Sequence, residues 1–420
     1  MKFEDYNIND GLKKSISKLG YVKPTDIQFK SIPHILRGED VLAIAQTGTG
    51  KTAAFAIPII DLLQKRKHDD RPDGIKCVVM EPTRELAMQI HEVFQSLAKH
   101  TKVTSLCVFG GVEQDSQIAD LQKGTDILIA TPGRMFDLVS QGYINFKRVE
   151  LLVLDEADHM LDLGFIKDIR DLIRFLPKKR QTLFFSATIS PTIKELAYSL
   201  VNKPVRIQIS PKDPVAKNVN HAVAFIEMDD KRFFLERLIN QHLESKILVF
   251  VRTKIRAERV MEAMKRVNIN SATLHGDKGQ SERTNALKKF KSGEVKVLIA
   301  TDVSARGIDI SGVEFVVNYD LPEKVENYVH RVGRTGRGNE RGQAISFCSE
   351  EEKAVLSEIE EYLTKEIQVL DIDKEEYTDT LVYTGEVNGN WKKLMVEAEE
   401  IEKKHKDAVS KRIKKKQKKQ

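Results

Sequence analysis

The stretch that decides the fold is Ala45-Gln46-Thr47-Gly48-Thr49-Gly50-Lys51-Thr52. It follows the apolar run VLAIA at 41–45, which predicts a buried strand, and it opens a segment that we expect to be helical. Glycines at this spacing let backbone N–H groups wrap around phosphate oxygens, as in a P-loop. We expect all eight residues to bind a nucleotide, with Lys51 on the β- and γ-phosphates and the Thr52 hydroxyl on magnesium. Ala45 stands where the general pattern has glycine, and alanine is tolerated there if its φ is negative.

A second apolar run, LLVL at 151–154, ends in the acids Asp155 and Glu156. A strand that delivers carboxylates to a loop beside a P-loop is what a magnesium site needs. Asp155 is then predicted to hold the metal through a water molecule, and Glu156 to orient and deprotonate an attacking water. Taken alone, the two acids fit a solvated helix cap better, and it is the P-loop that favours the metal site.

Short apolar runs alternate with longer amphipathic segments from residue 41 to about residue 350, which is typical of parallel sheets covered by helices. The predicted strands are 41–45, 76–80, 126–130, 150–154 and 182–186, then 222–227, 246–251, 295–300, 314–319 and 343–348. Between the two series, QISPKDPVAKNVN at 208–220 holds two prolines and few apolar residues, which indicates a linker. We predict an α/β fold of two similar domains, at 31–208 and 221–368, joined by a linker at 209–220.

The charge of the chain is concentrated at its C-terminal end. Seven basic residues and no acidic one lie between Lys411 and Lys419, and they exceed the net charge of +6 of all 420 residues. The rest of the chain is close to neutral, so any nucleic-acid surface on it must be local. We expect the C-terminal extension, 369–420, to end in a disordered basic tail that either tethers nucleic acid or only keeps the chain in solution.

Several function classes are excluded by simple patterns. No apolar run approaches the roughly 20 residues of a membrane-spanning helix. The N-terminal MKFEDYNIND lacks the apolar core of a signal peptide, so we expect a cytoplasmic protein without membrane contact. The three cysteines, Cys77, Cys107 and Cys348, are too far apart for a metal or redox pair and are expected to be buried small hydrophobic residues.

The acids after the second run continue as Asp155-Glu156-Ala157-Asp158, which is DEAD in one-letter code. The order of motifs from Phe3 to about residue 350 resembles that of DEAD-box RNA helicases. The resemblance implies two tandem RecA-like domains and an ATP-dependent RNA helicase that hydrolyses ATP to ADP and phosphate with Mg²⁺. It also implies sequence-independent contacts to the RNA backbone, local unwinding of short duplexes or remodelling of ribonucleoprotein, and a monomer whose partners include ribosomal or RNA-decay proteins.

Residues 1–30 resemble the adenine-reading segment of the family, the Q motif. Gln28 offers both a donor and an acceptor, which suits the edge of adenine. Phe3 is expected to stack on the adenine ring, with Tyr21 beside it.

The resemblance also implies segments that contact RNA in both domains. Hydroxyls, arginines and helix N-termini at these segments suit phosphate oxygens. The expected RNA-contacting residues are Pro82, Thr83, Arg84, Gly110, Gly111, Thr131, Pro132, Gly133 and Arg134 in the first domain, and Gly276 and Thr301 in the second. Gly276 belongs to the motif His275-Gly276-Asp277 with Gln280 and Arg283, and Asp309 is expected at the ribose of ATP.

Two further motifs are expected to couple hydrolysis to RNA. Ser186 and Thr188 resemble the coupling motif, which follows a predicted strand. Arg334 and Arg337 resemble arginine fingers that bring positive charge to the γ-phosphate from the opposite domain. Because they are three residues apart, we expect them to share one face of a helical turn. His330 is expected to link this motif to Ser186.

Two other functions fit the phosphate chemistry alone: a DNA helicase or translocase with the same two-domain plan, and a non-enzymatic RNA clamp. The adenine-reading segment argues against the first, and the intact Glu156, Arg334 and Arg337 argue against the second. The short basic extension is most similar to bacterial members, in particular the RhlE-like branch.

Overall fold

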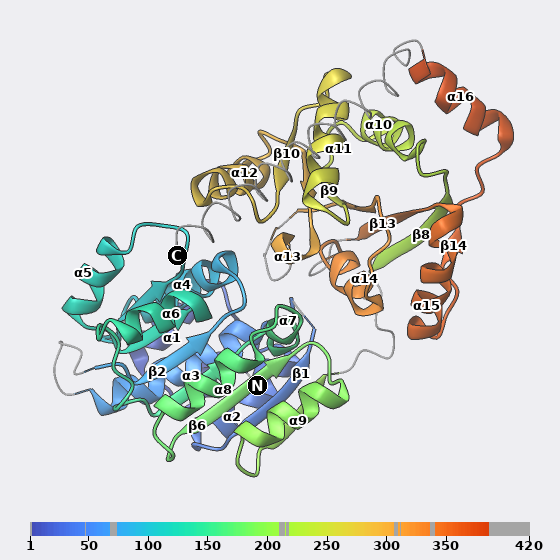
Figure 1. The fold of residues 1–420 in the computed structure, drawn as a ribbon. Helices are drawn as coiled ribbons and strands as arrows, with labels where there is room; N and C mark the ends of the chain where they lie inside the picture. The colour runs from blue at the N-terminus through green and yellow to red at the C-terminus, as the bar shows by residue number, and fades with distance from the viewer. Residues whose placement is uncertain are drawn as a thin grey trace, which may run out of the picture.

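The structure, a computed structural model, describes residues 2–46, 48–67, 74–209, 215, 218–305, 310, 312–336 and 341–385. The predicted site residues Thr47, Asp309 and Arg337 lie outside these ranges, as do most of the predicted linker and the whole basic tail. The chain forms two α/β domains, each built on one sheet (Figure 1). None of the helices within the described ranges has the length and apolar character to cross a membrane.

The first domain contains a parallel sheet in the order β3-β4-β2-β5-β6-β1-β7. Its strands are β1 (Val41–Ala45), β2 (Cys77–Met80), β3 (Ser105–Val108), β4 (Ile127–Ala130), β5 (Leu151–Leu154), β6 (Gln181–Ser186) and β7 (Val205–Ile209). Helices cover both faces, so alternate residues of a central strand enter two different cores. In β1, Val41 and Ala43 belong to one core and Leu42 and Ile44 to the other, which explains the continuous apolar run.

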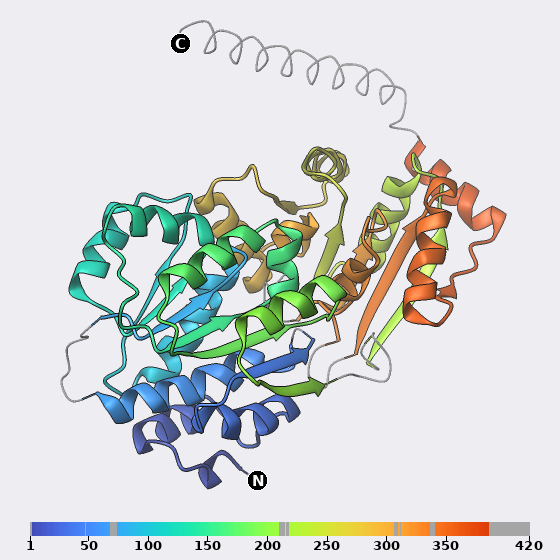
Figure 2. The same ribbon diagram turned by 60° about the horizontal axis from the view of Figure 1, so that its bottom comes forward.

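The helices of the first domain divide between these two cores. One face carries α1 (Asp10–Lys18), α2 (Asp26–Leu36), α3 (Lys51–Arg66) and α4 (Arg84–Ala98). The other carries α5 (Asp115–Lys123), α6 (Pro132–Ser140), α7 (Ala157–Asp162), α8 (Ile166–Phe175) and α9 (Pro191–Leu200). Figure 2 shows the blue N-terminal helices on one side of the sheet and the green ones on the other.

The second domain has a parallel sheet in the order β10-β11-β9-β12-β13-β8-β14. Its strands are β8 (Val219–Phe225), β9 (Ile247–Phe250), β10 (Ser271–Leu274), β11 (Val297–Ala300), β12 (Phe315–Asn318), β13 (Gly342–Cys348) and β14 (Gln368–Val369). Its helices are α10 (Lys231–Gln241), α11 (Lys254–Arg266), α12 (Gln280–Ser292), α13 (Asp302–Ala305), α14 (Val325–Val332), α15 (Lys353–Leu363) and α16 (Lys374–Gly385). Numbered from β8, the strand order repeats that of the first sheet, so the two domains are copies of one topology.

The repeated topology puts a lysine at the same place twice. Lys51 begins the helix after β1, and Lys231 begins the helix after β8. Lys231 is completely buried; its ammonium pairs with Glu352, donates to the carbonyl oxygen of Tyr319 at 2.8 Å and lies 4.0 Å from a carboxylate oxygen of Asp320. The five residues between β8 and Lys231 include no glycine. In the second domain the lysine is thus part of an internal ion pair.

The two domains contact each other through residues that follow their strands. Glu85 of α4 accepts a hydrogen bond from Nε of Arg283 in α12 at 2.7 Å, and both side chains are buried. Arg84 donates to Gln280 across the same interface at 3.5 Å. The strand ends of both sheets therefore line one shared region between the domains.

Candidate functional site

The predicted phosphate loop connects β1 to α3. Ala45 is the last residue of β1, so the departure from glycine falls within a buried strand and before the turn. Gly48 and Gly50 have φ of 84° and 93°, which a residue with a side chain rarely adopts. A Cβ on Gly50 would also lie 2.5 Å from Nε2 of Gln28. These two glycines are required by the backbone, and they leave Lys51 and Thr52 in the first turn of α3.

Lys51 meets the acids at the end of β5. Its ammonium lies 3.0 Å from Oε1 of Glu156, and both side chains are buried. Burial lowers the pKa of Lys51, but the carboxylates of Glu156, Asp155 and Asp158 outweigh it and raise that pKa above its ordinary value. Burial raises the pKa of Glu156, but Lys51, His330 and Arg334 outweigh it and hold that pKa well below its usual range. The arrangement keeps both members of the pair charged at neutral pH.

Asp155 and Glu156 are oriented by the turn between β5 and α7. Glu156 has a φ of 47°, and its N–H donates to Oδ1 of Asp155 at 2.9 Å. A residue other than glycine in this left-handed region carries strain, which is common at functional sites. Burial raises the pKa of Asp155 to about 7 against the lowering effect of Lys51. A buried carboxylate of this kind is suited to a cation.

The predicted coupling motif contacts the last acid of the DEAD sequence. Thr188 donates to Oδ2 of Asp158 through its N–H at 3.0 Å and through its hydroxyl at 3.1 Å. Ser186 is completely buried at the end of β6. The sequence identified both segments but not this pairing, because 30 residues separate them.

A cavity of about 70 Å³ lies between the two domains at this point. Gln46, Ala187 and Thr188 line it from the first domain, and His330 and Tyr362 are among its second-domain residues. His330 therefore faces the coupling motif across the cavity, where the sequence analysis expected it to make a link.

The arginine motif spans the end of α14. The helix ends at Val332, so His330 lies on the helix and Arg334 lies in the turn after it, not on the helical turn expected for it. Arg337 lies outside the described residues, so the face that the two arginines are expected to share stays a prediction. Gly333 is the C-cap residue of α14, and Gly336, further along the turn, has a φ of 65°. Arg334 is 2% exposed and donates from Nε to the carbonyl oxygen of His330 at 3.1 Å. Its charge still acts on Glu156 across the domain boundary.

The adenine-reading segment is attached to the phosphate loop. Gln28 accepts a hydrogen bond from the N–H of Thr25 at 2.9 Å and donates to the carbonyl oxygen of Gly50 at 3.1 Å. Phe3 is buried, with its ring centroid 6.2 Å from that of Tyr21. The more exposed ring of this pair belongs to Tyr21.

The predicted RNA-contacting residues of the first domain cluster at helix N-termini. Thr83 caps α4, where its hydroxyl accepts from the N–H of Leu86 at 3.4 Å. Thr131 is the N-cap residue of α6 after β4, without a hydrogen bond from its side chain, and Pro132 is the first residue of the helix. The guanidinium of Arg84 lies over Gly111, where a Cβ would come within 1.9 Å of it. Gly111 must therefore be glycine for Arg84 to cross the loop.

Gly110 and Gly133 lie in the same group of loops and helix starts, and Gly133 is exposed. Arg134 donates to the carbonyl oxygen of Val112 at 2.8 Å, which ties the loop after β3 to α6. The predicted RNA-contacting residues of the first domain therefore all lie at the C-terminal ends of the strands β2, β3 and β4.

In the second domain, Gly276 is exposed after β10 and Thr301 directly precedes α13. Sequence reasoning missed Thr253, which caps α11 after β9 as Thr83 caps α4 after β2, and its hydroxyl accepts from the N–H of Arg256 at 3.2 Å. The signal was available, since β2 and β9 are the second strands of the two copies and a threonine follows closely after each.

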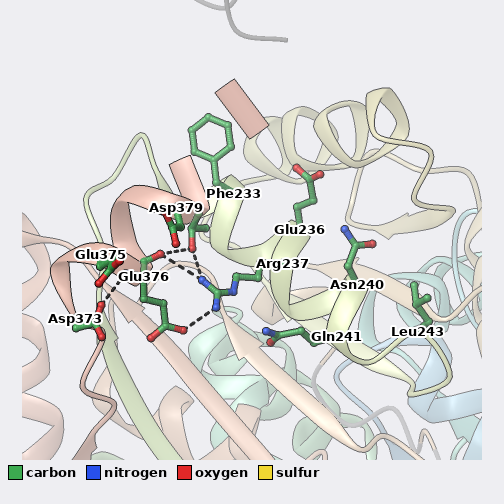
Figure 3. A pocket seen from close by; sticks show the side chains of 11 residues that line it. Phe233, Glu236, Arg237, Asn240, Gln241, Leu243, Asp373, Glu375, Glu376 and Asp379 are labelled. Atoms are coloured by element: carbon green, nitrogen blue, oxygen red, sulfur yellow. Dashed lines mark hydrogen bonds and ion pairs between the residues drawn. The ribbon is translucent and has the colours of Figure 1, made fainter. Parts of the chain in front are cut away.

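A much larger cavity, of about 810 Å³, lies between α10 and α16, on the second domain alone (Figure 3). Carboxylates of both helices line it, and Arg237 donates to Glu376 at 2.8 Å across it. It contains none of the predicted site residues, so its size does not make it the candidate site.

Comparison with known proteins matches the motifs and the geometry. The family model "DEAD/DEAH box helicase" matches residues 25–196, and "Helicase conserved C-terminal domain" matches residues 230–339. The "ATP-dependent RNA helicase RhlB" of Shewanella woodyi is 42% identical over 384 residues, covering 90% of this chain and 87% of that protein. The predicted RhlE-like branch is not tested by these matches and stays a prediction.

Among solved structures, Saccharomyces cerevisiae Dbp5 bound to RNA and ADP BeF3 matches with a TM-score of 0.79 and 31% identity, covering 91% of this chain and 98% of that one. A structure of a variant of the same yeast protein, bound to Nup159, Gle1, IP6 and ADP, matches with a TM-score of 0.60. The arrangement of the two domains is thus more similar to that of the RNA-bound relative. On the family models and on the identity to RhlB over most of both chains, this chain belongs to the DEAD-box family of ATP-dependent RNA helicases.

Proposed function

We propose that this helicase hydrolyses ATP at a site in the first domain, and that residues of the second domain complete this catalytic site. The observation that carries the proposal is the buried cluster of Lys51, Glu156 and Asp155, on which His330 and Arg334 act from the other domain. Hydrolysis on such a site depends on whether the domains are closed. The rate of ATP hydrolysis would therefore depend on where the second domain lies relative to the first.

Lys51 and Glu156 exchange partners in this mechanism. Phosphate oxygens compete with Glu156 for the Lys51 ammonium, because the phosphates carry more negative charge. Released from its ion pair, Glu156 accepts a proton from the attacking water. After this release, the charges of His330 and Arg334 still favour the ionised form of the Glu156 carboxylate, which is able to accept. Arg334 would stabilise the charge that develops on the γ-phosphate.

The residues around the P-loop fit a magnesium ion. Mg²⁺ prefers oxygen ligands and keeps several of its own waters, and Thr52 and Asp155 supply a hydroxyl and a carboxylate at the right end of the sheet. These two residues would hold the ion, Asp155 through a water molecule. When bound, Mg²⁺ neutralises charge on the phosphates as they separate.

We propose that RNA lies along the strand ends that the two domains share. Helix starts at Thr83, Thr131 and Thr253 offer backbone N–H groups to phosphate oxygens. Contacts of this kind read the backbone and not the bases, so binding would not depend on RNA sequence. Because ATP and RNA each favour the closed arrangement, each would raise the affinity for the other.

Gln28 would read the edge of adenine, and Phe3, whose ring lies beside that of Tyr21, would stack on the adenine ring. We propose in addition a monomer that works in the cytoplasm, with ribosomal or RNA-decay proteins as candidate partners.

The central test is ATP turnover by the purified chain with and without RNA. RNA should raise the turnover rate by about 10-fold or more through its coupling to ATP, and single-stranded DNA of the same sequence should not. Glu156→Gln should still bind ATP and RNA but lose turnover by about 10² to 10⁴-fold, because it loses the base. Equal stimulation by DNA would favour the translocase, and absence of turnover in the parent would favour the RNA clamp.

A further inference from the structure

Glu81 is a buried acid next to the phosphate site that belongs to none of the motifs. It directly follows β2, whose last residue, Met80, is paired with Leu154 of β5. Glu81 therefore lies beside Asp155, and register neighbours of parallel strands point to the same face of the sheet. Burial raises the pKa of Glu81 well above its usual range, and Asp155 and Glu156 raise it further against the lowering effect of Lys51, so its carboxyl group shares their site.

The carboxyl group of Glu81 is not satisfied by the protein. It is 0% exposed, and neither oxygen accepts a hydrogen bond from any residue that the structure describes. Its neighbours do have partners, since Glu156 pairs with Lys51 and Asp155 accepts from the N–H of Glu156. Burying a carboxyl group without hydrogen bonds is costly, so its retention here calls for a donor from outside the chain.

The chemistry of the site limits what this donor can be. The phosphate oxygens of ATP are acceptors, so they cannot supply the missing donor. Lys51, the nearest cation, is committed to Glu156 or to phosphate. Water molecules bound to Mg²⁺ donate strongly, and the ion keeps several of them. Because Asp155 is expected to hold the ion, these water molecules would lie next to Asp155 and therefore next to Glu81.

We propose that Glu81 is a third acidic residue of the magnesium site, and that it accepts hydrogen bonds from water molecules bound to the ion. It is a positioning residue, because it acts on the ion through water and does not touch ATP. The inference rests on the proposed use of Mg²⁺ with ATP and adds a residue to it.

Glu81→Gln tests the inference, because the amide keeps the shape and replaces one acceptor by a donor. In the full chain, the Mg²⁺ concentration for half-maximal binding of a fluorescent non-hydrolysable ATP analogue should rise about 10-fold, as for other residues that act on a metal through its ligands. Binding of the same analogue in EDTA should be unchanged. Paramagnetic resonance of Mn²⁺ in place of Mg²⁺ gives a second measure of ion affinity. Glu81→Asp keeps both acceptor oxygens on a shorter side chain. Its Mg²⁺ concentration for half-maximal binding should lie between that of the parent and that of Glu81→Gln.

Asp61→Asn is the matched control. Asp61 is a buried carboxylate near the far end of α3 that accepts from the N–H of Asn9 at 2.7 Å. This change should lower the unfolding temperature and leave the Mg²⁺ requirement as in the parent. An unshifted requirement in Glu81→Gln overturns the inference, whatever its unfolding temperature, and so does an equal loss of binding with and without Mg²⁺. If the parent itself binds the analogue equally well in EDTA, the proposed use of the metal fails along with it.

Discussion

Arg334 shows how one side chain connects two domains. It is buried in its own domain, held by the carbonyl oxygen of His330, yet its charge lowers the pKa of Glu156 in the other domain. The predicted arginine-finger role would use this charge on the phosphate during bond breakage.

We predict that Arg334→Ala lowers turnover of ATP about 10³-fold, the lower limit for arginine fingers, while the dissociation constant of ATP changes far less. Single-turnover kinetics and equilibrium binding separate the two. Arg341→Ala, which removes an exposed arginine of the same domain, is the control and should match the parent. A parallel loss of binding and turnover in Arg334→Ala would show that the residue binds the ground state.

At this scale the sequence predicted which residues of the candidate phosphate loop lie together, because Gly50, Lys51 and Thr52 are adjacent in the chain. It could not predict Glu81 or the pairing of Thr188 with Asp158. Those neighbours are made by strand order, and a run such as VVM before Glu81 does not reveal which strand lies beside it.

Among the elements, the strands divide into those that the sequence predicted and those that it did not. All the predicted strands form, and they include every central one. The missed strands β3, β7, β10 and β14 are the edges of the two sheets. An edge strand is only partly covered, so it admits residues such as Ser105, Arg206 and Ser271 and loses the apolar run. The apolar pattern therefore predicts the central strands of a sheet and misses its edge strands.

The ion pair of Lys231 and Glu352 is an element-scale interaction, since it joins α10 to the segment after β13. Burial raises the pKa of Glu352, but Lys231 outweighs it and the pKa is lowered. Removing one partner of a buried pair leaves an uncompensated charge, which costs about 3–5 kcal/mol. We predict this loss of unfolding free energy for Glu352→Gln at pH 7, measured by denaturant unfolding followed by circular dichroism.

The pH dependence gives the check on this assignment. Because the folded pKa of Glu352 lies below the unfolded value of about 4.3, its stabilisation is present above that pH and is lost as the pH falls through the folded pKa. The parent should lose this stability on acidification, and Glu352→Gln should lose less. The double change Lys231→Met with Glu352→Leu should recover part of the free energy at pH 7. Identical acid sensitivity in parent and variant would contradict the role given to this carboxylate.

For the whole molecule, the contact between Glu85 and Arg283 joins residues 198 positions apart in the sequence. Because this ion pair forms between the two domains, it favours the arrangement in which they meet. Arg283 also donates to the carbonyl oxygen of His275 at 3.0 Å, which connects it to the predicted RNA segment of the second domain. No sequence pattern could show this contact, because it depends on how two separately folded domains meet.

We predict that Glu85→Gln and Arg283→Gln each weaken binding of RNA in the presence of an ATP analogue, and that the double variant is not weaker than the worse single variant. The coupling free energy should be about 0.5–3 kcal/mol, as for residues in direct contact. Fluorescence anisotropy of a labelled RNA measures it. Binding of the ATP analogue without RNA should stay near the parental value in all three variants, and fully additive losses would exclude a direct interaction.

The duplicated sheet has a consequence for stoichiometry. A molecule made of two copies of one topology offers two places where a nucleotide could bind. In the second copy, however, Glu352 neutralises Lys231, and no glycine lies among the five residues between β8 and this lysine. We therefore expect that the second domain does not bind ATP by itself and responds only to the ATP bound by the first domain. Each chain should accordingly take up a single ATP, and every cycle of gripping and release should consume one molecule of it.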